Sequence, residues 1–306
     1  MSLRICQPGL QSLLVDHGRP HCRHLGLPLG GAADRSALAL GNALVGNEPD
    51  AAAIEMTLLG PTVEALQPTA CVVFGAPFQA SVRGQLLAPG TTFTLEAGDV
   101  LHVGGTNRGV RGYLCVAGGF DAPDVLGSRS SLQPLLANDV LICRASRIDP
   151  RGLPEQAYQW ASDNERVLRV LEGPQQDWFA DTAFFNQSYE VLPASNRMGV
   201  RLKGPPLLRR PGELISEAVA PGAIQVTNDG LPVILGVDGQ TIGGYPKIAH
   251  VIRADLDQLA QLRPGERVQF VVVSLDQAEQ AARQRNDFLA GWLARLRVAE
   301  RPPVFI

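Results

Sequence analysis

The residues best suited to chemistry are polar side chains that crowd positions 225–247 of this chain. Acidic, amide, hydroxyl, phenol and ammonium groups are all present there: Gln225, Asn228, Asp229, Asp238, Gln240, Thr241, Tyr245 and Lys247. Lys247 stands out because Lys203 is the only other lysine. An ammonium group in such a cluster stabilises charge that develops on an amide oxygen, or binds a carboxylate or phosphate. We therefore predict catalytic roles for Lys247, Asp238 and Tyr245, and substrate binding by Gln225, Asn228, Asp229, Gln240 and Thr241.

The strongest charges of this cluster are Asp229, Asp238 and Lys247. A straight strand between the two aspartates would separate them by roughly 25–30 Å, so only a turn or the curvature of a barrel would bring them together. Positions 238–247 are close enough in sequence to share one loop. The alternative is that the Asp-Gly and Gly-Gly pairs there only form turns. We favour turns for the glycines and a site for Lys247, Tyr245 and Gln240.

Arg197 and Arg201 form a second candidate group. They are four residues apart where a strand is expected over 198–202, and side chains at even spacing on a strand share a face. Both guanidinium groups would then converge on one anion, which makes them candidate substrate-binding residues. The alternative is an ordinary salt bridge.

Several other chemistries are disfavoured. His17, His21, Cys22 and His24 have the side chains of zinc ligands, but no second cluster completes a site, so we predict no metal. The chain has no Gly-x-Ser-x-Gly motif and no Gly-Lys dipeptide, which argues against a nucleophile elbow and a phosphate-binding P-loop. Neither lysine has the flanking methionines of a biotin-accepting site, so we expect no biotin on this chain.

Short apolar runs bounded by glycine-rich turns predict the strands that position these groups. Around the polar cluster they cover 223–226, 232–237 and 248–252. Further strands are expected at 12–15, 52–57, 71–74, 91–95, 100–103, 110–116, 167–171, 189–192 and 268–273, the last of them buried. Helices are expected after an Asp34 N-cap as far as Leu44, over 178–185, over 254–262 and over 275–299. We predict a mainly β protein with few helices and two β-rich lobes: residues 1–150, a linker over 151–165, and residues 166–306, which end in the long helix.

Three blocks of sequence resemble one known family. They are the residues from Ala223 through Asp229-Gly and Asp238-Gly-Gln-Thr-Ile-Gly-Gly-Tyr-Pro-Lys, those from Pro8 to Asn47, and Asn196-Arg-Met-Gly-Val-Arg-Leu-Lys-Gly-Pro. This pattern resembles the biotin-dependent carboxyltransferase-like family, which includes the second subunit of allophanate hydrolase, the KipA proteins and the C subunit of bacterial 5-oxoprolinase. The resemblance covers nearly the whole chain and implies a cyclophilin-like β-barrel in the C-terminal half.

The resemblance also implies a function. It is greatest to the 5-oxoprolinase component, which suggests ATP-dependent opening of the lactam of 5-oxoproline to glutamate together with a sister, KipI-like subunit. ATP would act at the level of the complex. Two alternatives stay open: a carboxyltransferase subunit that acts on urea or a similar amide with biotin from another protein, and a non-catalytic KipA-like regulatory module.

Composition agrees with a folded protein of this kind. The 306 residues are 45% hydrophobic and 19% charged, and 32 Gly with 23 Pro indicate many turns. A net charge of −3 argues against non-specific nucleic-acid binding. No apolar run is long enough to predict a membrane span, and no signal peptide is evident, so we expect a cytoplasmic protein with reduced cysteines.

Overall fold

The computed structural model of the chain describes residues 2–153, 165–179, 183–298 and 303–306. Its residues form two compact units. Unit 1 comprises Met1–Gly18, Gly30–Trp160 and Phe288–Ile306, and unit 2 comprises Arg19–Leu29 and Ala161–Asp287. These units differ from the continuous halves expected from the sequence, because a short N-terminal loop joins unit 2 and the last residues join unit 1. Most of the expected linker lies outside the described residues.

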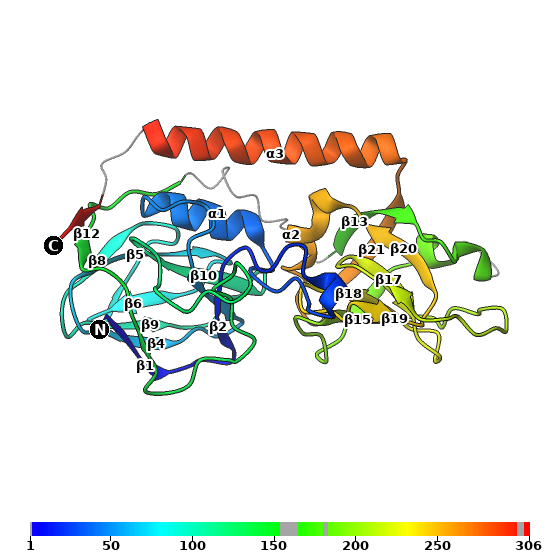
Figure 1. Cartoon of the computed structure of the whole chain (residues 1–306), viewed down its shortest axis with the longest axis horizontal. Coiled ribbons are helices and arrows are strands. Elements are labelled where there is room, and N and C mark those ends of the chain that lie inside the picture. The colour runs from blue at the N-terminus through cyan, green and yellow to red at the C-terminus, as the bar shows by residue number, and fades with distance from the viewer. Residues whose placement is uncertain (1, 154–164, 180–182, 299–302) are drawn as a thin grey trace. The chain divides into compact units, whose positions relative to one another are not determined.

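Unit 1 is built on two antiparallel sheets, visible in Figure 1. One has the strand order β11-β1-β4-β9-β6-β7, with bounds Val140–Leu141, Leu3–Gln7, Thr62–Ala65, Val100–Val103, Ala80–Val82 and Gln85–Leu86. The other has the order β2-β3-β10-β5-β8, with bounds Ser12–Val15, Ala53–Thr57, Arg111–Val116, Thr69–Gly75 and Phe93–Leu95. A small pair joins β12 (Ser146–Arg147) to β22 (Val304–Phe305). A short 3₁₀ helix, η1 (Arg23–Leu25), lies in the N-terminal loop that belongs to unit 2.

Apolar side chains fill unit 1 in two layers. One cluster, which includes Leu3, Met56 and Leu101, packs residues of both sheets together. The other includes Leu38, Val72 and Tyr113 and packs α1 (Arg35–Leu44) against β5 and β10. The alternation of buried residues along these strands, as in Thr62–Ala65, is the period-2 pattern that a half-buried strand requires.

The predicted helix after Asp34 is confirmed. Asp34 is the N-cap of α1, and its side chain accepts a hydrogen bond of 2.9 Å from the Ala37 amide. A capping aspartate satisfies one of the helix's unpaired N–H groups and contributes about 1 kcal/mol.

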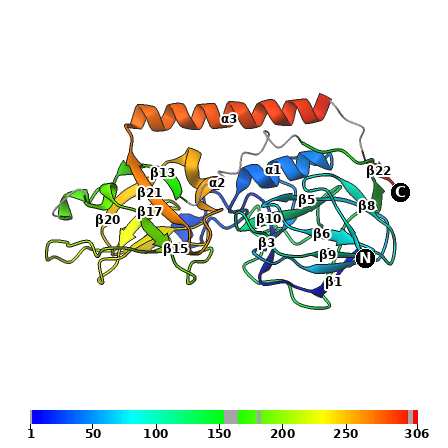
Figure 2. The same ribbon diagram turned by 180° about the vertical axis from the view of Figure 1, so that it is seen from behind.

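Unit 2 is a closed barrel with the strand order β13-β20-β17-β18-β15-β14-β21, seen from behind in Figure 2. The bounds in that order are Glu165–Glu172, Lys247–Val251, Ala223–Val226, Pro232–Leu235, Gly199–Lys203, Tyr189–Val191 and Arg267–Val272. Beside the barrel, β16 (Glu217–Ala218) pairs with β19 (Ile242–Gly243). The predictions of a mainly β chain with few helices and of a barrel in its C-terminal half are confirmed.

The barrel interior is apolar and includes a group of aromatic rings. Phe184 stacks on Phe270 with ring centroids 4.6 Å apart, and Tyr189 lies 5.5 Å from Phe184. All three side chains are at most 2% exposed. Aromatic contacts of this kind add about 0.5–1.5 kcal/mol beyond the burial of area.

Three expectations for unit 2 need correction. The helix expected over 254–262 is a 3₁₀ turn, η5 (Arg253–Asp255), followed by the short α2 (Leu256–Leu259). In the segment expected as a helix over 178–185, the described residues include parts of the 3₁₀ helices η3 (Gln176–Trp178) and η4 (Ala183–Asn186), and 180–182 lie outside the described residues. The last strand, β21, is not buried throughout, because Val271 and Val272 are 46% and 41% exposed. β-branched residues favour a strand but do not tell how many of its faces are covered.

The long helix α3 (Leu275–Val298) follows the prediction closely. Its Ala278 and Ala281 belong to an apolar cluster with Ile252 of unit 2. Its Leu296 belongs to the α1 cluster of unit 1. No helix among the described residues is both long enough and apolar enough to cross a bilayer.

Candidate functional site

Unit 2 contains a cavity of about 230 Å³ beside the barrel strands β15, β17 and β18. Its lining residues are Asn196, Met198, Gly199, Arg201, Gln225, Thr227, Val233, Leu235, Gln240 and Tyr245. A more open cavity of about 450 Å³ shares Gln240 and Tyr245 with it, so the two adjoin. The second cavity is also lined by Arg209, Gly212, Glu213, Leu214, Asn228 and Gly244. We call the two together the amide site.

Two glutamine side chains define the chemistry of the amide site. Gln225, on β17, is 2% exposed. Its Nε2 lies 3.5 Å from the Tyr245 carbonyl oxygen, and Gln240 Nε2 lies 3.4 Å from Gln225 Oε1. Both distances exceed the usual 2.7–3.2 Å of an N–H···O bond. Gln225 is therefore only weakly held by Tyr245 and Gln240, and both glutamines line the smaller cavity.

Gly243 leaves the room that these amides occupy. A Cβ at Gly243 would lie 2.6 Å from Gln225 Nε2 and 2.7 Å from Gln240 Nε2. Gly243 is also the strand partner of Glu217 in the β16–β19 pair. The adjacent Gly244 has no such constraint on the amides, because its nearest neighbours would be Ser216 Oγ at 3.2 Å and the Leu214 carbonyl at 3.4 Å.

Lys247 is buried next to the amide site but does not line either cavity. It is 6% exposed and is the Cα partner of Gln225 across β17 and β20. Its Nζ donates to Glu217 Oε1, and Gln175 Nε2 donates to the same oxygen at 2.9 Å. The Lys247 ammonium, and after it the Gln175 amide, lowers the pKa of Glu217. The Glu217 carboxylate is therefore charged and pairs with Lys247.

Glu217 and Gln175 were missed by the sequence analysis. A buried lysine needs a compensating carboxylate, which was a usable signal. The sequence did not say which acid it was, because Glu217 lies 30 positions away in a strand of two residues.

Asp238 and Arg197 neutralise each other. Arg197 Nε and Nη2 donate to the two carboxylate oxygens of Asp238 at 2.7 and 2.9 Å, and the side chains are 4% and 14% exposed. The expected convergence of Arg197 and Arg201 on one anion is therefore wrong, and the salt-bridge alternative holds for Arg197. Arg197 precedes β15 rather than lying on it, so the even-spacing argument did not apply. Arg201 lies on β15, is exposed and lines the smaller cavity.

Of the remaining predicted site residues, some line one of the two cavities and others line neither. Asn228 lines the larger cavity, and its Oδ1 accepts a hydrogen bond of 2.9 Å from Arg209 Nη2. Asp229 lines neither cavity: it accepts from Thr227 Oγ1, the main cause of the lowered pKa of Asp229, and from the Leu231 amide within the turn. Thr241 also lines neither cavity. Asp229, Asp238 and Lys247 are each held by different partners, so they do not form one charged set.

An N-terminal arginine that the sequence analysis did not select also supports the site. Arg23 Nη2 donates to the carbonyl oxygens of Val219 at 2.6 Å and of Gln240 at 2.9 Å. The loop Arg19–Leu29 belongs to unit 2, which explains this contact. Arg23 therefore fixes the backbone that carries the Gln240 amide.

No cluster of three or more His, Cys, Asp and Glu side chains suited to a metal ion is present in the described part of the chain. The amide site is lined by amides, the Tyr245 phenol, arginines and the Glu213 carboxylate, and it lies beside the ion-paired Lys247.

Comparison with known proteins identifies the family of this chain. A model of the carboxyltransferase domain, subdomains A and B, matches residues 25–272, and the chain belongs to this family. Among its relatives is the C subunit of 5-oxoprolinase from Escherichia coli K12, which is 34% identical over 301 residues, or 94% of this chain and 96% of that protein. The corresponding 5-oxoprolinase C subunit of Haemophilus influenzae is 33% identical over 300 residues, or 91% of this chain and 94% of that protein.

A solved structure is similar throughout. The urea amidolyase of K. lactis superposes with a TM-score of 0.88 at 29% identity over 95% of this chain. This chain spans only 20% of that protein. The likeness therefore concerns one part of a much larger enzyme.

Proposed function

We propose that this protein is the C subunit of an ATP-dependent 5-oxoprolinase, in which the amide site binds the cyclic amide. The observation that carries the proposal is the pairing of two weakly bonded amides, that of the buried Gln225 and that of the exposed Gln240, with the exposed Arg201 in one cavity. Full-length similarity to two proteins named as C subunits of 5-oxoprolinase supports it.

The lining of the cavity is suited to a small cyclic amide that bears a carboxylate. Gln225 and Gln240 each offer an amide N–H and an amide C=O, the complement of a lactam's C=O and N–H. Arg201 has a forked guanidinium that binds a carboxylate in two hydrogen bonds. The aliphatic side chains of Val233 and Leu235 cover the ring. Three recognition elements thus meet in about 230 Å³.

Lys247 supplies positive charge from next to the cavity in this proposal, since it lines neither cavity but is the partner of Gln225 across β17 and β20. When the lactam opens, negative charge develops on its amide oxygen, and a nearby preorganised cation lowers the barrier. Glu217 and Gln175 hold the ammonium in place without exposing it to water. We propose that Glu217 positions Lys247 and that Tyr245 bounds the ring.

ATP enters only at the level of the complex. A lactam is a poor electrophile. Phosphorylation of its amide oxygen by ATP would turn that oxygen into a leaving group before water attacks the carbonyl carbon. The amide site has donors for a carboxylate and an amide but no glycine-rich lysine loop for a triphosphate. We therefore propose that a sister subunit binds the nucleotide.

The test is co-expression with the sister subunits and measurement of 5-oxoproline-dependent ATP hydrolysis. We expect Lys247→Ala to abolish turnover while the complex remains folded, since the Glu217 left behind is 44% exposed and can be hydrated. Gly243→Ala should raise KM by displacing both amides, whereas the control Gly291→Ala, on α3, where a Cβ would meet no atom within 4 Å, should behave as wild type. Unchanged turnover in Lys247→Ala would remove Lys247 from the mechanism, and equal behaviour of the two glycine variants would remove the amides.

A second function is favoured by the likeness to urea amidolyase. A carboxyltransferase would use the same amide site for urea, with biotin delivered by another protein. Incorporation of labelled bicarbonate in place of 5-oxoproline-dependent ATP hydrolysis would identify this activity.

A further inference from the structure

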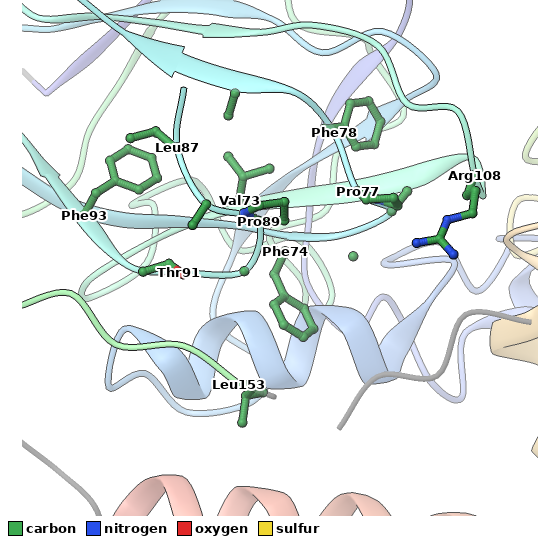
Figure 3. A pocket seen from close by; sticks show the side chains of 15 residues that line it. Val73, Phe74, Pro77, Phe78, Leu87, Pro89, Thr91, Phe93, Arg108 and Leu153 are labelled. Carbon is green, nitrogen blue, oxygen red and sulfur yellow. The ribbon is translucent and has the colours of Figure 1, made fainter. Parts of the chain in front are cut away.

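Unit 1 has a cavity of its own that the proposed reaction does not use. It encloses about 370 Å³, which lies within the 300–1,000 Å³ of ordinary small-molecule sites. It is formed where β5 ends and where β6 and β8 supply Ala80 and Phe93. Figure 3 shows the side chains that line it. All of its lining residues belong to unit 1, whereas those of the amide site belong to unit 2.

Most of the side chains that line this cavity are apolar, although much of its exposed surface is polar. Phe74, Phe78 and Phe93 contribute aromatic rings, and Leu87 contributes an aliphatic wall. Phe74 and Phe78 belong to the core clusters of unit 1 and are only 6% and 2% exposed. A ligand that enters exchanges water for these surfaces, and the gain in free energy grows with the apolar area that it buries.

Polar side chains are confined to two positions of the lining. Thr91 supplies a hydroxyl, and Arg108 supplies a guanidinium. In Figure 3 Arg108 stands at one end beside Pro77, and Phe93 and Leu87 stand toward the other end. Thr106 holds the backbone of Arg108, because its Oγ1 donates to the Arg108 carbonyl at 2.7 Å. The cavity therefore has a cation at one end and Phe93 with Leu87 toward the other.

We propose that this cavity is a second ligand site, for a small carboxylate with an apolar body. The apolar body, an acyl chain or an aryl ring, would lie against Phe74, Phe78 and Phe93. The carboxylate would lie at Arg108, whose planar fork matches its geometry. The positive charge at this end selects an anion over an alcohol or an amine of the same shape.

Fluorescence displacement on the full chain tests the proposal. The probe is 8-anilinonaphthalene-1-sulfonate, with octanoate and 3-phenylpropanoate as competitors; they distinguish the acyl from the aryl class. We expect at least one of the two acids to bind with a dissociation constant about tenfold lower than that of octanol or octylamine. A tenfold difference is the size expected for one charge-assisted contact.

Variants show where binding occurs. Ala88 is exposed and lines the cavity, so Ala88→Trp should block the probe without disturbing the core. Arg108→Ala should weaken the acid about tenfold and leave octanol unchanged, whereas the control Arg4→Ala, on β1, should change neither. Thermal unfolding confirms that each variant is folded. Probe binding that survives Ala88→Trp, or equal affinity for acid and alcohol, would overturn the proposal.

Discussion

The Arg197–Asp238 ion pair gives the sharpest test of the barrel's geometry. We predict that removing either partner, as in Arg197→Met or Asp238→Asn, destabilises unit 2 by about 3–5 kcal/mol. The structure supports this magnitude because two hydrogen bonds of 2.7 and 2.9 Å join side chains that are 4% and 14% exposed. Charge-assisted bonds contribute about 1.5–3 kcal/mol each. The loss exceeds that of a surface pair because the remaining charge stays buried.

The assay is urea unfolding of each variant, followed by far-ultraviolet circular dichroism and tryptophan fluorescence. With a slope of about 3 kcal/mol/M or less, the midpoint should fall by about 1 M or more. The double variant Arg197→Met/Asp238→Asn should be much less unstable than the sum of the single ones, with a coupling free energy of at least about 2 kcal/mol. Arg283→Met is the control, because its partner Glu279 and Arg283 itself are 56% and 70% exposed, and it should cost less than about 1 kcal/mol.

Two outcomes would refute this reasoning. Single variants that unfold within about 1 kcal/mol of wild type would show that the pair is not buried as described. A coupling free energy near zero would show that the two side chains do not interact. Either result would return Asp238 and Arg197 to the set of residues available for substrate.

Packing and charge give three further predictions. Gly236→Ala should destabilise the barrel by more than about 2 kcal/mol, since its Cβ would lie 2.2 Å from the Arg197 carbonyl oxygen, and thermal unfolding measures this. Phe184→Ala should cost about 3–5 kcal/mol by opening a cavity in the aromatic core, whereas a change below about 1 kcal/mol in urea unfolding would contradict that packing. Burial raises the pKa of Asp16, but hydrogen bonds, chiefly from Ser128 and Ser130, outweigh it and lower the pKa below 3.8. The ionised Asp16 carboxylate therefore stabilises the fold above about pH 4, and this stabilisation is lost as the pH falls through the native pKa. The loss of unfolding free energy caused by Ser130→Ala should be full at pH 7 and should shrink in acid. A deficit independent of pH would contradict the role of Asp16.

The sequence by itself determined where many of the strands and helices of this protein lie. Strands such as Ser12–Val15 and Ala223–Val226 have the predicted bounds, because apolar runs between glycine turns are a local signal. The Asp34 cap and the long helix α3 were also local signals. Within the glycine-rich block, Gln225, Gln240 and Tyr245 were grouped by their closeness in sequence, and all three line one cavity.

Only the tertiary structure decided which charges meet. Lys247 pairs with Glu217, and Asp238 with Arg197, 41 positions away. Barrel closure and the β16–β19 pair bring these residues together, and neither is encoded in the spacing of the residues themselves. Local sequence fixes which face of a strand is apolar, but the partner of a buried charge depends on which strands become neighbours in the closed barrel.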